Sequence, residues 1–248
     1  MRTRFVGELQ LLHRSFIGMG ELTLDAVSHA LDCLSRNEGA SYERATHLES
    51  AVDDRGRKVH DRALEILVLK SPVAEDARLV TGILESSVEL EQIADYAYEI
   101  AGLAFRTNSP SIVQFVSEVV TVGAKVRELL VIGIDSWRHP DRELTRSVRS
   151  KQSLIREQTR GVSASLDQLI SDPGNVHVYV NLVLVCRHFE RITRHVYQVA
   201  EHAAAAAPTE HNNDLETGRL IRSFLNEHGS STLPPHLRQF GDSSDQYR

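Results

Sequence analysis

The sequence predicts an all-α protein built as two repeated three-helix bundles in one elongated chain, followed by a polar C-terminal tail. Three observations support this fold class. Six long segments carry apolar residues at the three- and four-residue spacing of an amphipathic helix. Gly and Pro are sparse, at 14 and 7 of 248 residues, and only 6% of the chain is aromatic, which suits helices better than a β-sandwich. The third observation is an internal repeat of about 100 residues, which is typical of duplicated helical units.

The first predicted helix covers residues 5–36. Apolar side chains recur along it at helical spacing: Leu9, Leu12, Phe16, Met19, Leu22, Ala26, Ala30 and Cys33. The sequence Asn-Glu-Gly at residues 37–39 predicts its end, because Gly commonly follows the last turn of a helix. A second helix is expected over residues 41–69.

The third predicted helix, over residues 71–105, begins with clear N-terminal signals. We expect Ser71 to be the N-cap and Pro72 to occupy the first helical position, where its missing N–H costs nothing. Glu75 and Asp76 follow at once and favour the positive end of the helix dipole. This start places the third helix antiparallel to the second across a tight connection.

A polar break at residues 107–110 precedes three more predicted helices. These cover residues 112–136, 141–171 and 175–207. Asp-Pro-Gly at residues 172–174 separates the last two. The strongest β-branched run, residues 178–185, continues into a helical pattern without a turn, so no strand is expected there.

The two halves can be laid over each other. Residues 88–101, VELEQIADYAYEIA, align with residues 187–200, RHFERITRHVYQVA, so that Glu91 corresponds to Glu190. In the same way the Met-Gly pair ending at Gly20 matches the Val-Gly pair that ends at Gly123. The predicted domains are a first bundle over residues 5–107, a second bundle over residues 111–207, and a flexible polar tail with a short helix over residues 208–248.

Composition limits the classes of function. A net charge of −6 and a pI near 6.1 argue against nucleic acid as the main partner. The N-terminal MRTRFVGELQ lacks the apolar run of a signal peptide, and no stretch of about 18 apolar residues could span a membrane. Cys33 and Cys186 are far apart in apolar surroundings, which is typical of reduced core cysteines. We therefore expect a cytoplasmic protein, peripheral to a membrane at most.

Two pairs of acids, each spaced four apart, form the candidate site. They are Glu49 and Asp53 on the second helix, and Glu91 and Asp95 on the third. Glu49 precedes Ser71 by 22 residues and Glu91 follows it by 20, so antiparallel helices place both pairs at similar height. Like charges at this spacing destabilise a helix by about 0.2–0.5 kcal/mol per pair. Protonation, Arg or Lys partners, or a multivalent hard cation would relieve the repulsion. A solvated acidic face is the alternative interpretation.

The second half lacks this set of acids. Lys151 and Ile155 take roughly the places of the first acidic pair, and Arg194 takes the place of the last acid. We therefore expect Glu190 to pair with Lys151 or Arg194, and expect one ion site, in the first bundle.

Three other patterns are weaker. His188, His195 and His202 recur at seven-residue spacing; they could bind a transition metal across a dimer contact, but a partly exposed stripe is the favoured interpretation. Glu85 and Glu89 are expected to face solvent. A run of basic residues on the fifth helix could meet an acidic partner or membrane headgroups, or be a solvated face: Arg142, Arg146, Arg149, Lys151, Arg156 and Arg160. No catalytic triad or nucleotide-binding motif is present, so we expect no enzymatic activity.

The ordered set of motifs resembles the PhoU family of bacterial phosphate-uptake regulators. The family's acidic D/E-xxx-D is read here as ESAVD at residues 49–53, and its LERIGD-like phrase as LEQIAD at residues 90–95. A phrase close to QPVAxDLR is read as SPVAEDAR at residues 71–78. The opening ELxxLxxxxxxMG is similar to residues 8–20. The resemblance covers about residues 5–205.

The resemblance implies a function that the residues alone do not. PhoU-like proteins are usually dimers that bind metal on their acidic faces, which here implies Glu49, Asp53, Glu91 and Asp95 as ligands of an iron, zinc, manganese or magnesium ion. They are not enzymes; they act with the ATPase of a phosphate ABC transporter and a phosphate-sensing histidine kinase to restrain phosphate uptake and phosphate-starvation signalling. The second half departs from the family motif, which leaves its role open. The alternatives are a carboxylate-bridged metal-handling or redox bundle, and a metal-free scaffold paralogue.

Overall fold

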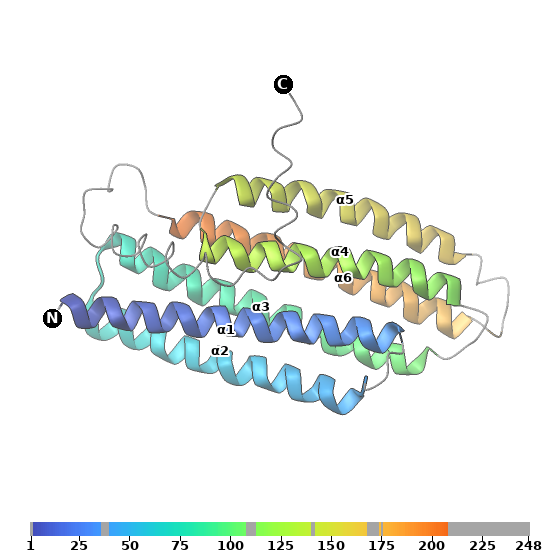
Figure 1. The fold of residues 1–248 in the computed structure, drawn as a ribbon, viewed down its shortest axis with the longest axis horizontal. Coiled ribbons are helices and arrows are strands. Elements are labelled where there is room, and N and C mark those ends of the chain that lie inside the picture. The colour runs from blue at the N-terminus through green and yellow to red at the C-terminus, as the bar shows by residue number, and fades with distance from the viewer. Residues whose placement is uncertain are drawn as a thin grey trace, which may run out of the picture. The chain divides into compact units, whose positions relative to one another are not determined.

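The protein is all-α, as predicted. The computed structural model describes residues 2–35, 40–107, 113–139, 142–167, 174 and 176–207. Within these residues there are six helices and no strand (Figure 1): α1 (Arg2–Ser35), α2 (Tyr42–Lys70), α3 (Ala74–Arg106), α4 (Val113–Arg138), α5 (Arg142–Leu166) and α6 (Val176–Ala206). No helix of the described part has an apolar stretch long enough to cross a bilayer. The predicted tail, residues 208–248, lies outside the described residues.

The six helices pack as two sets of three. α1, α2 and α3 contact one another, and so do α4, α5 and α6. Figure 1 shows all six running lengthwise, with the first set below and the second above. The two sets are joined because α3 packs on α6 and α1 packs on α4. Residues 1–207 form one compact unit. The structure thus confirms a pair of three-helix bundles, while the division at residues 107–111 stays a prediction.

A cluster around Trp137 joins α1, α4 and α6. The Trp137 ring is buried and meets the Phe16 ring edge-on, with centroids 5.0 Å apart. Its indole N–H donates to the carbonyl of Val199 at 3.1 Å, and His13 Nε2 lies 2.9 Å from the Trp137 carbonyl. Each of these polar groups finds a partner across a helix contact, as buried polar groups must.

Two glycines allow α1 and α4 to approach closely. A Cβ at Gly20 would lie 3.1 Å from the Ile134 side chain, and a Cβ at Gly123 would overlap the side chains of Leu31 and Phe189. These are the glycines that the internal repeat matches. Both therefore serve the same purpose, which is to make room for a side chain of the other half.

The connection between α2 and α3 differs from the prediction. Ser71 is not an N-cap: it ends α2 in the left-handed conformation, with φ 44° and ψ 61°. The N-cap of α3 is Val73, which makes no side-chain cap hydrogen bond. The physical reason is that a sharp turn needs a residue of positive φ immediately after α2. Glu75 and Asp76 lie in the first turn of α3, as predicted.

The histidines of α6 form a ladder with glutamates of α3. Each of the three histidines faces one glutamate on the antiparallel neighbour. The pairs and their N···O distances are His188–Glu99 (3.2 Å), His195–Glu89 (2.5 Å) and His202–Glu85 (3.0 Å). The prediction of a partly exposed stripe is wrong for His188, which is buried. Glu85 is exposed, as predicted, whereas Glu89 is half-buried against α6. We call these three pairs the histidine–glutamate ladder.

Candidate metal centre and its basic counterpart

Three of the four predicted acids converge between α2 and α3. Val52 and Val59 of α2 are fully buried. Their burial sets the rotation of α2, so that Glu49 and Asp53 lie at the edge of its contact with α3. One oxygen each of Glu49, Asp53 and Asp95 lies within 4.8 Å of the other two. All three side chains are half-buried. The antiparallel arrangement predicted from the sequence therefore produces a cluster rather than a linear row of charge.

Glu91, the fourth predicted acid, lies beside this cluster and packs over Gly56 of α2. A Cβ at Gly56 would overlap the carboxylate of Glu91 and come within 3.1 Å of the Met19 methyl group. Sequence reasoning missed Gly56. Its signal is a lone Gly inside an uninterrupted helix, where it costs roughly 0.5–1 kcal/mol relative to Ala unless close packing requires it.

The surroundings of the cluster disfavour the ionised forms of the carboxyl groups of Glu91 and Asp95. Burial, followed by the charges of Asp53 and Asp95, raises the pKa of Glu91; Arg57 and His60 oppose this in part. Burial, followed by Asp53, Glu49 and Glu99, raises the pKa of Asp95. Among the described residues no Lys or Arg forms an ion pair with any of the four acids. The cluster is therefore a site of negative charge that Arg57 and His60 offset only in part.

The donor set fits a hard cation. Carboxylate oxygens are the ligands preferred by Mg²⁺, Mn²⁺ and oxidised iron, and three of them from two helices already converge here. No histidine or cysteine belongs to this group of described residues, which makes the set less typical of zinc. The neighbours Ser50 and Gln92 donate hydrogen bonds to Glu49 and Asp95, both at 3.2 Å, and so orient two of the acids.

In the second half, Glu190 pairs with a different residue from those predicted. Its carboxylate accepts from Arg187 at 3.0 Å, one turn earlier on α6, and not from Lys151 or Arg194. The expected register was off by one position on α5. Lys151 is exposed and lies outside the pocket described below, while Ile155 is buried in the core.

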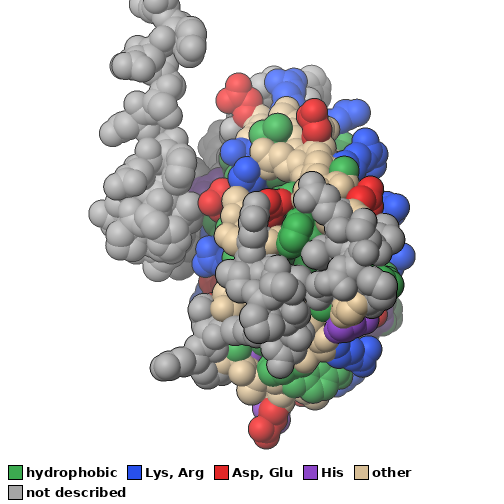
Figure 2. Space-filling view, turned by 90° about the vertical axis from the view of Figure 1, so that its right-hand side faces the viewer, with side chains coloured by type: hydrophobic (Ala, Val, Ile, Leu, Met, Phe, Trp, Pro, Cys, Tyr) green, Lys and Arg blue, Asp and Glu red, His purple; other side chains and the backbone are tan. Residues whose placement is uncertain are grey.

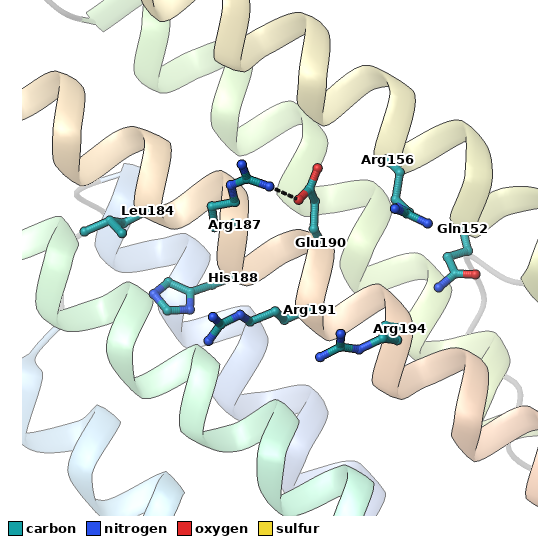
Figure 3. A pocket seen from close by; sticks show the side chains of 8 residues that line it. All are labelled: Gln152, Arg156, Leu184, Arg187, His188, Glu190, Arg191 and Arg194. Carbon is teal, nitrogen blue, oxygen red and sulfur yellow. Dashed lines mark hydrogen bonds and ion pairs between the residues drawn. The ribbon is translucent and has the colours of Figure 1, made fainter.

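A pocket of about 520 Å³ lies between α5 and α6 around Glu190. Figure 3 shows Gln152 and Arg156 reaching from α5 toward the side chains of α6. Its lining residues are Gln152, Arg156, Leu184, Arg187, His188, Glu190, Arg191 and Arg194. We call it the basic pocket. Gln152 and Arg156 have the same four-residue spacing on α5 as Glu49 and Asp53 on α2. The second half therefore has a basic pocket at the position where the first half has the acidic cluster.

The comparisons with known proteins agree with this architecture. Residues 16–104 match the family described as "PhoU domain". A relative from Pseudomonas aeruginosa, named "Phosphate-specific transport system accessory protein PhoU homolog", is 24% identical over 203 residues, which cover 80% of this chain and 83% of the relative. A relative of the same name from Aquifex aeolicus is 26% identical, covering 74% of this chain and 84% of the relative.

Two solved structures share the fold. The crystal structure of PhoU from Pseudomonas aeruginosa superposes with a TM-score of 0.75 at 23% identity, covering 82% of this chain and 98% of that one. The regulatory protein PhoU of the phosphate transport system from Streptococcus pneumoniae gives a TM-score of 0.72 at 20% identity, covering 82% and 96%.

Proposed function

We propose that the chain, which is similar to PhoU proteins over most of its length, restrains phosphate uptake and phosphate-starvation signalling. The observation that carries the proposal is the match to relatives named as accessory proteins of the phosphate-specific transport system, which extends over 80% of the chain. The proposed role is regulatory: the chain would act by binding other proteins and would carry out no chemical step.

The proposed partners are the ATPase subunit of a phosphate ABC transporter and a phosphate-sensing histidine kinase. We propose that the protein lies in the cytoplasm as a homodimer and links the transporter to the kinase. The test is deletion of the gene, with phosphate uptake and a phosphate-starvation reporter measured in rich and poor phosphate. We expect uptake and reporter expression to stay high in rich phosphate and to fall when the parent gene is restored. Unchanged uptake and expression in both media would refute the proposal.

We further propose that the acidic cluster holds a multivalent cation. Glu49, Asp53 and Asp95 would provide the ligands, with Glu91 adjacent as a source of further negative charge. Bound there, the ion would supply positive charge that replaces the repulsion among the acids by attraction. Because the ligands come from both α2 and α3, the ion would also fix these helices against each other. Elemental analysis of protein purified without chelator would identify the ion.

A further inference from the structure

The basic pocket has an unusual balance of charge. Four guanidinium groups and one carboxylate line it, so the wall carries a formal charge of +3 with His188 neutral. In the end-on view of Figure 2, most of the visible Lys and Arg side chains lie in the upper half of the molecule, where α4, α5 and α6 are found. The protein as a whole has a net charge of −6, so the positive charge at this pocket is a local feature.

Three of the four guanidinium groups are available to a ligand. Arg187 pairs with Glu190, but no carboxylate of the described residues forms an ion pair with Arg156, Arg191 or Arg194. No ion pair within the described part of the chain therefore offsets their mutual repulsion. The available groups come from two helices, Arg156 from α5 and the other two from α6, so they surround the pocket instead of following one helix face.

Part of the wall is held in place before any ligand binds. The Arg191 guanidinium lies over the Tyr96 ring, 5.5 Å from its centroid, an arrangement that attracts a cation to the aromatic face. His188 is also fixed, because its Nε2 contacts Glu99 across the α3–α6 contact. The buried Nδ1 of His188 has no hydrogen-bond partner among the described residues.

We propose that the basic pocket binds a small anion that carries two or more phosphate groups. Guanidinium groups match phosphate oxygens with paired hydrogen bonds, and Gln152 adds an amide donor at the same wall. A volume of about 520 Å³ is in the usual range for a small-molecule site and is much larger than one phosphate ion needs. A charge of +3 is matched by linked phosphates and not by a single one. The half-exposed Leu184 at the wall leaves room for an apolar part of the ligand.

The test is isothermal titration calorimetry of the full chain, freed of metal by chelator and dialysis, with pyrophosphate, tripolyphosphate, inorganic phosphate and citrate at one ionic strength. We expect saturable binding of pyrophosphate and tripolyphosphate, and binding of inorganic phosphate at least about tenfold weaker. Citrate has comparable charge without phosphate groups. Equal binding of citrate would overturn the proposal.

Two variants locate the binding. Arg156→Gln and Arg194→Gln each remove one guanidinium, the first from α5 and the second from α6. Each is expected to weaken pyrophosphate binding about tenfold or more, the effect of a lost charge-assisted hydrogen bond. Arg160→Gln is the matched control, because Arg160 is an exposed arginine one turn further along α5 and outside the pocket. Equal losses in all three variants, or no loss in the first two, would overturn the proposal. So would binding to vesicles of anionic lipid without binding to either soluble oligophosphate.

Discussion

Replacing Asp95 by Asn tests whether the acidic cluster is a metal site. The change keeps the shape of the side chain and removes one of the three converging carboxylates. A cation at a hundredfold excess over its dissociation constant stabilises the folded parent by about 2.7 kcal/mol. For a chain of this length such a gain raises the melting temperature by roughly 5–10 °C. We expect this metal-dependent rise in the parent and its loss in Asp95→Asn.

The same variant should behave differently without metal. The folded-state pKa of Asp95 is raised, so its charged form opposes folding at neutral pH. In chelator, Asp95→Asn should therefore melt at the same temperature as the parent or higher. Lowering the pH toward the raised pKa values of Asp95 and Glu91 should also reduce the metal effect in the parent, because protons compete with the cation.

The assay is thermal unfolding followed by circular dichroism, with added metal and with chelator. Asp61→Asn is the control, since Asp61 is an exposed acid of α2 outside the cluster and its loss should leave the metal effect intact. Equal melting temperatures of the parent in metal and in chelator would refute the reasoning. Glu91→Gln distinguishes two geometries: it should retain part of the rise if three oxygens form the site, and lose all of it if Glu91 is a fourth ligand.

Two glycine changes and one histidine change extend the test to the fold. Gly161→Ala should stabilise the protein by about 0.5–1 kcal/mol, because nothing lies within 4 Å of the added methyl group. Gly123→Ala should destabilise it by about 1–3 kcal/mol, because the added methyl group overlaps the core. Urea unfolding measures both changes, and equal effects would contradict the packing described. Burial lowers the pKa of His188 below its ordinary 6.5, so the unfolded chain binds more protons and stability present at neutral pH is lost as the pH falls below about 6.5. The fall in melting temperature from pH 7.5 to 5.5 should accordingly be smaller in His188→Gln than in the parent, and an equal fall would exclude this histidine as a source of it.

Local pattern was enough to predict the helices and their pairing. The spacing of residues such as Leu9, Leu12 and Phe16 is a property of a single helix, and the short connection near Ser71 forces α2 and α3 to run antiparallel. The convergence of Glu49, Asp53 and Asp95 follows from those two facts. These features could be predicted because each depends on neighbours close in sequence.

Contacts between the two halves could not be predicted in this way. The partners of His188, His195 and His202 lie about 90–120 residues away, and nothing in the local pattern indicates that α6 packs on α3. The basic pocket was missed for a related reason. A register error of one position on α5 exchanges the buried Ile155 for the pocket residue Arg156, since adjacent residues of a helix point in directions about 100° apart.

The histidine–glutamate ladder has a mechanical consequence. If α6 slid along α3 by a single helical turn of about 5.4 Å, all three of the present pairs would separate at the same time. The three pairs therefore oppose this movement together, although each of them is weak. The acidic cluster is carried partly by α3 and the basic pocket partly by α6. The ladder therefore holds the helix that carries part of the negative site in one register against the helix that carries part of the positive site.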